Sequence, residues 1–489
     1  MKILFVGSEL NPLAHTGGLG DVMAALPAAI RKAGHDARII MPLYKQIKLN
    51  YQNELKFVRW SMIRLGWRTM YSGLFRMTVN GVPVYLIDNE YYFGHDAIYL
   101  DYAFDIERFS FFQRAVLEAL GQAMDFTPDI LHLNDWQSAM IPVLLEAHHA
   151  DDEHYRNLKT VLTIHNLKYQ GVHGREQVQD YLELPNYFFS EARILQNGVP
   201  NFLKAGIVYS DKITVVSPTY SEEILTDYYG EGLNGILGAQ KGKLKGILNG
   251  LDTESYDPAT DKCIAKNYDV SGWKSGKAFC RKTLEEELSF NSDDDIPLMA
   301  MVTRLTDQKG LDLLLHIGDE LLETTKARLA IIGTGDADLE NRLRALQARH
   351  PDKMRTLFSF EPEKARRLYA ASDIFLMPSL FEPCGLSQMI AMRYGSLPVV
   401  RQTGGLKDTV HPYNRFDGSG NGFGFLNINA HELLYTTKHA VSLYEKNPGA
   451  WGKLVETAMM GDYSWMNSAQ EYISLYKDLM SDQKDLELQ

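Results

Sequence analysis

The sequence predicts an α/β protein with two doubly wound parallel sheets, one in each half of the chain. Short apolar runs alternate with helical patterns from end to end, which is typical of parallel βαβ units. A chain of 489 residues also exceeds the size at which one hydrophobic core stops growing, roughly 250–300 residues. Glycine-rich or charged segments follow several of the runs, at the strand ends where ligands bind in such sheets.

Expected strands occur in both halves of the chain. They are 3–6, 37–43, 82–88, 130–135, 160–166 and 212–217 in the first half, and 297–305, 327–333, 373–379 and 397–403 in the second. The segment 246–262 is rich in Gly, Asp, Thr and Pro and lacks periodicity, so it is interpreted as a linker. We therefore expect an N-terminal domain at 1–245, a C-terminal domain at 263–466, and a last helix at 467–489 that ends in a charged tail.

Composition excludes several classes of function. The chain is 45% apolar and 23% charged, as in an ordinary globular protein. Its net charge of −12 argues against nucleic acid or an anionic membrane as a partner. Three scattered cysteines predict neither a disulfide framework nor a metal site. No apolar run approaches the ~18 residues of a membrane span, and the first one is too short for a signal peptide, so we expect a cytoplasmic protein.

The segment NPLAHTGGLGD, residues 11–21, places Gly17, Gly18 and Gly20 between the first strand and a helical pattern. Glycine permits close approach to the backbone, and a helix start favours an anion. A phosphate-bearing ligand over these glycines is one interpretation. A tight βα turn without a ligand is the other, because the spacing is not the G-x-G-x-x-G fingerprint.

In the second half, Arg304 follows a strand and Lys309 precedes a helix on the same short loop. The planar guanidinium and the compact ammonium could converge on a diphosphate. Two solvated surface cations are the alternative. Further along, Glu382 also follows a strand, and Gly404 and Gly405 follow the next one, which predicts a ligand floor; Glu382 could instead cap the helix after it.

Two strand ends in the first half carry polar residues. His165 lies at the end of the strand 160–166, and Asp135 lies at a strand-to-helix junction. A lone histidine is usually a hydrogen-bonded structural residue. Asp135 could be only an N-cap.

Together these segments resemble bacterial glycogen synthases and plant starch synthases. The motifs TGGLGDV, NDW, TIHNLKYQG, ILNGLD, TRLTDQKGLD, FEPCGLSQ and RQTGGLKDTV occur in the family's order across nearly the whole chain. The resemblance implies a GT-B architecture, in which two Rossmann-like doubly wound domains face a deep interdomain cleft and the C-terminal helix crosses back to the first domain. It also implies glucose transfer from ADP-glucose to the non-reducing end of an α-1,4-glucan (glycogen, starch or a malto-oligosaccharide), with retention of configuration and with neither a metal nor a cofactor.

The resemblance assigns roles residue by residue. It implies that His165, Arg304, Lys309 and Glu382 are catalytic and that Asp135 and Asp21 lie on the acceptor side. The residues it implies for the donor are His15, Gly17, Gly18, Asn249, Phe360, Cys384, Gly385, Leu386, Thr403, Gly404 and Gly405. Phe360 is expected to stack on the adenine.

One position departs from the family, which usually has lysine where this chain has His15. A neutral imidazole supplies less charge than an ammonium. Two alternatives therefore stand beside the glucan synthase: a transferase with another donor, such as UDP-glucose or sucrose-type chemistry, and a glucan-binding homologue with weakened catalysis. The sequence leaves the oligomeric state open. In a plant source the location would be the plastid, after removal of a transit peptide.

Overall fold

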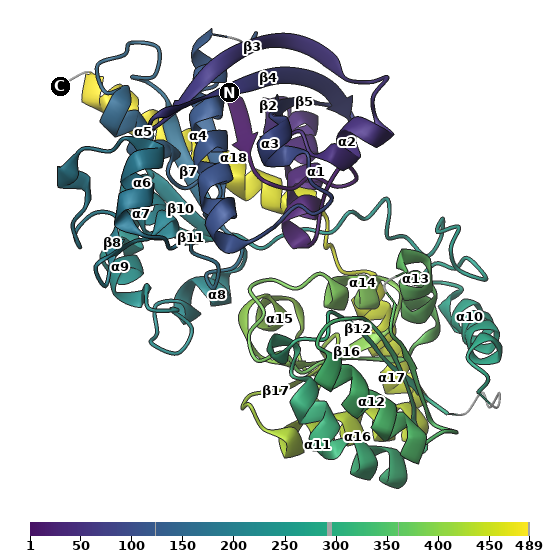
Figure 1. Ribbon diagram of the computed structural model, residues 1–489. Helices are drawn as coiled ribbons and strands as arrows, with labels where there is room; N and C mark the ends of the chain where they lie inside the picture. Colours follow the sequence, from purple (N-terminus) through teal and green to yellow (C-terminus); the bar gives the residue numbers. More distant parts are fainter. Residues whose placement is uncertain (123, 291–295, 360, 488–489) are drawn as a thin grey trace. The chain divides into compact units, whose positions relative to one another are not determined.

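The computed structural model describes residues 1–122, 124–290, 296–359 and 361–487. The chain divides into two compact units, each described here by itself (Figure 1). Unit 1 comprises Met1–Asn249 and Trp465–Gln489, and unit 2 comprises Gly250–Ser464. The division at Asn249 falls inside the segment 246–262 that the sequence marked as a linker.

Unit 1 is built on a nine-stranded sheet in the order β11-β10-β7-β6-β1-β2-β5-β4-β3. Its strands are β1 (Lys2–Val6), β2 (Asp36–Pro42), β3 (Lys56–Leu65), β4 (Arg68–Val79), β5 (Val82–Asp88), β6 (Ile130–Asn134), β7 (Lys159–Ile164), β10 (Lys212–Val215) and β11 (Leu244–Gly246). The short strands β8 (Leu195–Gln196) and β9 (Val199–Pro200) pair separately. From β11 to β5 the pairing is parallel, and every residue of β6 is buried, as expected of a sheet covered on both faces.

The antiparallel edge of this sheet was not predicted. β3 and β4 form a hairpin that extends the sheet beyond β5. Trp60 and Trp67 are exposed there, whereas the strands that were expected are mostly buried and apolar. An edge hairpin with charged and aromatic side chains facing solvent lacks the apolar-run signal that predicted the central strands.

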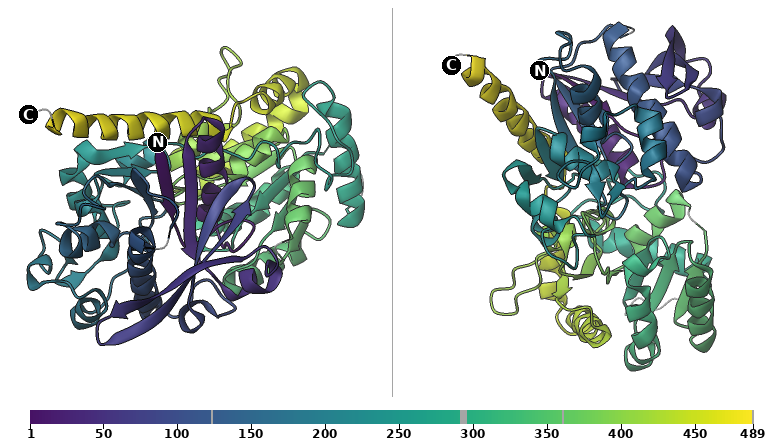
Figure 2. Two further views of the ribbon diagram at one scale, coloured as in Figure 1. Left: turned by 90° about the horizontal axis from the view of Figure 1, so that it is seen from above. Right: turned by 60° about the vertical axis from the view of Figure 1, so that its left-hand side comes forward.

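Helices cover both faces of the unit 1 sheet (Figures 1 and 2). They are α1 (Gly18–Lys32), α2 (Lys45–Asn50), α3 (Glu90–Phe93), α4 (Tyr102–Gln122), α5 (Ile141–His148), α6 (Arg175–Leu182), α7 (Phe202–Tyr209), α8 (Pro218–Glu223), α9 (Asn234–Ala239) and α18 (Trp465–Glu487), with single turns η1 (Asn186–Phe188) and η2 (Lys241–Lys243). The last helix lies beside α1, so the C-terminal segment completes the first unit (Figure 2).

Buried hydrogen bonds join α18 to the sheet. Tyr476 of α18 and His132 of β6 meet through the hydroxyl and Nδ1 at 2.5 Å. The other ring nitrogen of His132 lies 2.5 Å from the Thr163 hydroxyl of β7. The helix begins at Trp465, two residues before the predicted start.

Unit 2 is a six-stranded, wholly parallel sheet in the order β14-β13-β12-β15-β16-β17. Its strands are β12 (Leu298–Val302), β13 (Arg328–Ile332), β14 (Met354–Leu357), β15 (Ile374–Met377), β16 (Leu397–Arg401) and β17 (Phe423–Phe425). Its helices are α10 (Trp273–Glu287), α11 (Leu311–Thr324), α12 (Ala337–Arg349), α13 (Pro362–Ala371), α14 (Ser387–Arg393), α15 (Gly404–Thr409), α16 (Ala430–Lys446) and α17 (Pro448–Met459), and η3 (Asp307–Lys309) is a single turn.

The segment after the division belongs to unit 2 rather than to a free connection. Asp261 is buried, and its carboxylate accepts a hydrogen bond from the Tyr394 hydroxyl and one from Arg366. Polar side chains in the same segment close its turns on themselves, as Asp252 does with the N–H groups of Glu254 and Ser255. Most of the predicted linker is therefore ordered against unit 2.

Each sheet reverses its strand order at one point. In unit 1 the chain moves outward from β1 to β2 on one side and to β6 on the other. In unit 2 it moves from β12 to β13 on one side and to β15 on the other. Loops at the carboxyl ends of such neighbouring strands diverge and leave room for a ligand, so these two places are the candidate sites.

Candidate active site

In unit 2, the loops after β12 and β15 bring Lys309 and Glu382 into an ion pair. The Lys309 Nζ donates to Glu382 Oε2 at 2.6 Å, and the two side chains are 16% and 8% exposed. The Ser379 hydroxyl donates to the same oxygen at 3.0 Å. Glu382 therefore does not cap α14, and the capping alternative is wrong.

Backbone contacts fix the two loops together. The Leu380 N–H donates to the Gln308 carbonyl at 2.8 Å, and the Gln308 amide donates to the Phe381 carbonyl at 3.2 Å. Gly310 has a φ of 67°, and a Cβ there would lie 2.0 Å from the Pro378 carbonyl oxygen. Only glycine allows this approach, so the sequence K-G at the start of α11 is what lets Lys309 reach Glu382.

The glycine pair after β16 supports the Glu382 loop. The Gly405 N–H donates to the carbonyl oxygens of Glu382 and Pro383, at 3.1 and 3.2 Å. A Cβ at Gly404 would lie 2.0 Å from the Glu382 carbonyl oxygen. We expected these glycines to offer N–H groups to a ligand, but that of Gly405 is already bound to the loop. Thr403 precedes the pair as the N-cap of α15.

The remaining predicted residues of unit 2 lie along the same loops. Cys384 is buried, and Gly385 and Leu386 lead into α14. Arg304 is exposed at the end of β12, on the loop that carries Lys309. Phe360, the expected adenine contact, lies outside the described residues.

In unit 1, the glycine loop (residues 15–18) follows β1 and leads into α1. A Cβ on Gly17 or Gly18 would meet no atom within 4 Å, whereas one on Gly20 would lie 2.4 Å from the His15 Cβ. Packing therefore requires glycine only at Gly20. Gly17 and Gly18 leave the backbone open, and His15 is exposed beside them.

A buried carboxylate, Glu9, holds this loop. It accepts hydrogen bonds from the N–H groups of Thr16 and Gly17, at 2.7 and 3.2 Å. These two N–H groups are therefore not free for the phosphate that the sequence suggested. Asp21, expected on the acceptor side, accepts a hydrogen bond from the Asn11 side chain at 2.8 Å.

The ends of β6 and β7 join Asp135 to His165. Asp135 Oδ1 accepts the His165 backbone N–H at 2.7 Å, and His165 Nε2 lies 2.9 Å from Asn134 Oδ1. The Asp135 backbone has a left-handed conformation, with a φ of 54°. Its carboxylate binds the end of β7, and the N-cap of α5 is Met140, so Asp135 does not cap that helix. The sheet thus fixes both residues at one edge.

Burial acts in opposite directions on this pair. It raises the pKa of the Asp135 carboxyl to about 7, although the N–H groups of His165 and Asn166 favour the charged form. It lowers the pKa of the His165 imidazole to about 3, so His165 is neutral at physiological pH. Asn249, the last residue of unit 1 before the division, is buried, and its amide oxygen has no hydrogen-bond partner within the described residues.

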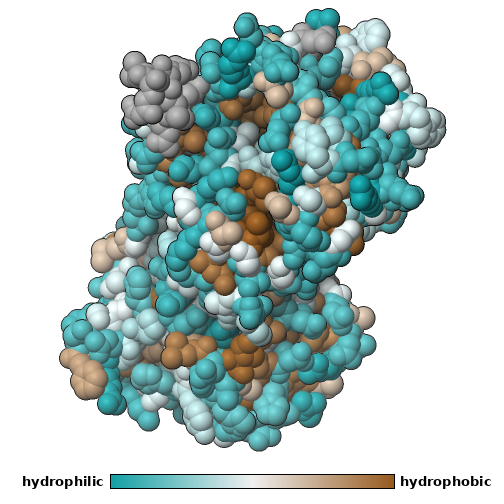
Figure 3. All heavy atoms as spheres, turned by 90° about the vertical axis from the view of Figure 1, so that its left-hand side faces the viewer, coloured by the Kyte–Doolittle hydropathy of each residue, from teal (hydrophilic) through white to brown (hydrophobic). Residues whose placement is uncertain are grey.

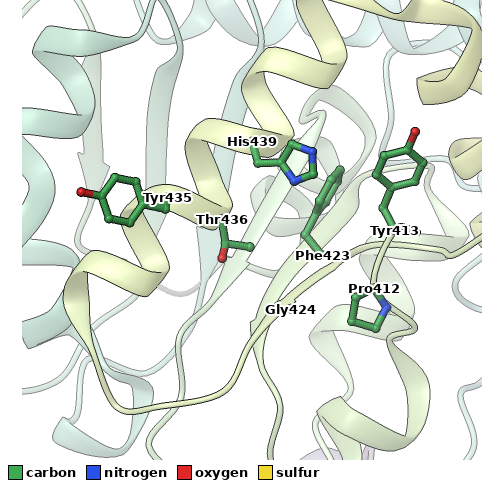
Figure 4. A pocket seen from close by; sticks show the side chains of 7 residues that line it. All are labelled: Pro412, Tyr413, Phe423, Gly424, Tyr435, Thr436 and His439. Carbon is green, nitrogen blue, oxygen red and sulfur yellow. The ribbon is translucent and has the colours of Figure 1, made fainter. Parts of the chain in front are cut away.

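A separate hollow of 240 Å³ lies on unit 2 and contains none of these residues (Figure 4). Its lining comprises Pro412, Tyr413, Phe423, Gly424, Tyr435, Thr436 and His439. The rings of Tyr413, Phe423 and His439 pack against one another, with centroids about 6 Å apart. These ring contacts are part of the packing of unit 2, so we assign no ligand to this hollow.

Across the parts of the chain that the structure describes, there is no cluster of three His, Cys, Asp or Glu side chains that could hold a metal ion. Nor do those parts contain a helix long and apolar enough to cross a membrane. The face drawn in Figure 3 is mainly hydrophilic, and its apolar residues form separate patches.

Two Rossmann-like units, one with Lys309 and Glu382 paired at its strand ends and the other with Asp135 and His165 joined at its own, are typical of a glycosyltransferase of the GT-B class. The starch synthase catalytic domain family matches residues 2–239, and group 1 glycosyl transferases match residues 283–435. Glycogen synthase from Clostridioides difficile is 47% identical over 98% of this chain and its own full length. The corresponding enzyme from Caldicellulosiruptor bescii is also 47% identical, with the same coverage. The chain belongs to the glycogen and starch synthase family.

Solved structures agree with this assignment. The catalytic domain of starch synthase IV from Arabidopsis thaliana, bound to ADP and acarbose, superposes with a TM-score of 0.91 at 32% identity, over 98% of this chain and 99% of that one. Sucrose-phosphate synthase from Thermosynechococcus elongatus, with a TM-score of 0.62 at 17% identity over 98% and 99%, shares the fold.

Sequence reasoning missed the residues that hold the site residues in place. Glu9, Ser379 and Asn134 each touch a predicted site residue or loop through a hydrogen bond. Glu9 had a usable signal, because a charged residue three positions after the first strand, in an otherwise uncharged stretch, is unusual. Asn134 stands in the NDW motif but was given no role, and Ser379 had no signal, since serine is common at strand ends.

Proposed function

We propose that this protein transfers glucose from ADP-glucose to the non-reducing end of an α-1,4-glucan with retention of configuration. Unit 2 receives the nucleotide diphosphate, and the strand ends of unit 1 contact the sugar and the acceptor. The relatives and the ADP-bound starch synthase support the donor and the acceptor. Bacterial glycogen synthases among the relatives also support a cytoplasmic location.

The observation that carries the proposal is the Lys309–Glu382 pair at the switch point of unit 2. Glu382 engages one ammonium proton of Lys309, which leaves two for phosphate oxygens. Arg304 lies on the same loop with a solvent-exposed side chain that is accessible to a ligand. Negative charge accumulates on the departing ADP as the glycosidic bond breaks, and preorganised cations stabilise that charge.

The residues of unit 1 have a complementary role. A neutral His165 can donate or accept a hydrogen bond at the glucosyl unit without adding positive charge beside an oxocarbenium-like centre. Asp135, when ionised, stabilises such a centre electrostatically. Its carboxylate can also accept a hydrogen bond from a hydroxyl group of the glucan. Arg304 and Lys309 take the place that a metal has in many other nucleotide-sugar enzymes, so we propose a metal-independent reaction.

The proposal is tested by transfer of labelled glucose to glycogen from ADP-glucose and from UDP-glucose, with and without EDTA. We expect preference for ADP-glucose and no effect of EDTA. Arg304→Ala and Lys309→Ala should each lower kcat by on the order of 100-fold or more. Lys438→Ala is the matched control, since it breaks a remote ion pair with Glu320 in the same unit.

The outcomes separate the alternatives. Equal or better use of UDP-glucose would favour a transferase with another donor. Glycogen binding without transfer from either donor would favour a weakened homologue, and the lysine-to-histidine change at His15 is the observation behind that second candidate. Wild-type rates in both Ala variants would refute the diphosphate assignment.

A further inference from the structure

Glu9 is saturated with hydrogen bonds by the loop that it adjoins. Its Oε2 accepts the N–H groups of Thr16 and Gly17, and its Oε1 accepts the Thr16 hydroxyl at 3.0 Å and the Tyr99 hydroxyl at 2.6 Å. A carboxylate has about four acceptor positions, and all four are in use. The residue is 4% exposed, so its role lies in these bonds rather than in direct chemistry.

The loop has few other anchors. His15 and Thr16 are exposed, and Gly17 precedes α1 without a side-chain cap. Gly17 and Gly18 bring no side chain of their own, and the space in front of them is open. Ordering a segment of this kind on ligand binding costs conformational entropy, unless contacts within the protein already hold it in place.

Glu9 holds the loop in place through these hydrogen bonds, and Tyr99 in turn holds the Glu9 carboxylate. Burial, together with Glu9, raises the pKa of the Tyr99 hydroxyl well above its ordinary range, so the hydroxyl keeps its proton and donates. The Ser8 hydroxyl lies 2.9 Å from the Tyr99 oxygen on its other side. The carboxylate is therefore fixed from the interior of unit 1, and the loop is fixed to the carboxylate.

We propose that Glu9 is a positioning residue for the donor, a role that rests on the proposed function. Its carboxylate holds the Thr16 and Gly17 backbone, which presents His15 and the open Gly17–Gly18 face in one arrangement before the nucleotide sugar arrives. The ordering cost is then met during folding rather than on donor binding.

The test compares the full-length wild type with Glu9→Ala, Glu9→Gln and Asp211→Ala. Asp211 is the matched control, because its carboxylate also accepts the N–H and the hydroxyl of one threonine, Thr160, at 2.8 and 2.9 Å. Thr160 lies at the start of β7, at the opposite end of that strand from His165. Hydrogen exchange reports the loop, and steady-state kinetics report the donor and the acceptor separately.

In Glu9→Ala we expect amide exchange at Thr16 and Gly17 to accelerate at least about tenfold and the KM for ADP-glucose to rise at least about tenfold. The KM for glycogen should stay within about twofold. Glu9→Gln should recover most of both losses, since its amide oxygen can accept the two N–H groups while its NH₂ donates to the hydroxyls. Asp211→Ala should accelerate exchange at Thr160 and leave the donor KM within about twofold.

Unchanged exchange at Thr16 and Gly17 in Glu9→Ala would overturn the anchoring. Faster exchange with an unchanged donor KM would overturn the positioning role. Equal rises in the KM for ADP-glucose in Glu9→Ala and Asp211→Ala would indicate general destabilisation and would also overturn the positioning role. A wild type that does not use ADP-glucose would refute the proposed function and the donor role with it, while the exchange rates would still decide whether Glu9 holds the loop.

Discussion

At the scale of single residues, Asp135 shows how the fold sets a protonation state. Asp135 is left-handed at the end of β6, and its carboxylate accepts the His165 N–H at the end of β7. Burial raises its pKa to about 7, above the ordinary value of about 3.8. A group with a raised native pKa stabilises the fold fully below its unfolded pKa and loses that contribution as pH rises through the native pKa.

Asp135→Asn should therefore change how stability depends on pH. Between about pH 4 and pH 8 the wild type should lose on the order of 2–4 kcal/mol of unfolding free energy relative to the variant, because the variant has no carboxylate to desolvate. Urea unfolding at pH 4.5, 7 and 8.5 would measure this difference. His165, whose pKa burial lowers to about 3, makes stability rise with pH up to about pH 6.5, but it does so in both proteins and therefore cancels in the comparison. Parallel stability curves for the two proteins would contradict the assigned pKa.

His15 carries a second prediction at this scale. It is exposed on the glycine loop, where the family usually has lysine, and a protonated ring would assist a departing diphosphate. An imidazole supplies less positive charge than an ammonium. His15→Lys should therefore increase kcat with ADP-glucose, and His15→Ala should lower it. Equal kcat values for all three proteins in the labelled-glucose assay would exclude a charged role.

At the scale of elements, buried and exposed strands differ in how well the sequence predicts them. Every run assigned as a strand from continuous apolar residues is a strand of one of the two sheets. The hairpin of β3 and β4 was missed, because both faces of β3 are partly exposed, as at Arg59, Trp60 and Met62, and the strand shows no clean alternation. β14 and β17 were missed because each is only three or four residues long.

The C-terminal helix α18 is an element that the sequence places only in part. Its position against unit 1 depends on Tyr476 and on His132, whose pKa burial lowers to about 3, so the ring is neutral. A neutral imidazole has one donor and one acceptor nitrogen, and here both have hydroxyl partners. The contact between Tyr476 and His132 joins residues 344 positions apart, so the sequence around either residue gives no sign of it.

Tyr476→Phe should therefore lower the free energy of unfolding of unit 1 by about 1–3 kcal/mol, because it leaves one buried nitrogen of His132 without a partner. Tyr228→Phe is the control, since Tyr228 is 67% exposed in the same unit. Chemical denaturation followed by circular dichroism would measure both. A loss no larger than that of the control would show that the hydrogen bond contributes nothing.

At the scale of the whole molecule, the two units each have their own sheet and core. The sequence predicted both, because alternating strands and helices are recorded locally. It places the expected site at the carboxyl ends of these strands, where ligands bind in such sheets, and that placement stays a prediction. It could not predict that Lys309 and Glu382 pair, since 73 residues separate them and only the order of β12 and β15 in the sheet brings them together.

Separate cores predict two unfolding transitions, and Lys277 identifies one of them. This lysine of α10 is buried, and its Nζ donates to the carbonyl oxygens of Ala370, Ser372 and Tyr394 at 3.0, 2.7 and 2.9 Å. Lys277→Met keeps most of the length of the side chain but removes the donor of three buried hydrogen bonds. It should destabilise unit 2 by about 2–5 kcal/mol, and calorimetry should show one transition lowered while the other, marked by Tyr476→Phe, stays in place.

ADP should then act on the transition that Lys277→Met lowers. A ligand that binds only the native state stabilises it by about 2.7 kcal/mol at 100 times its Kd. If the diphosphate binds at Arg304 and Lys309, this gain belongs to unit 2, and Lys309→Ala should remove most of it, whereas Lys438→Ala should not. A shift confined to the transition that Tyr476→Phe lowers would move the nucleotide to unit 1. A single transition that responds to both variants would mean that the two cores unfold as one cooperative body.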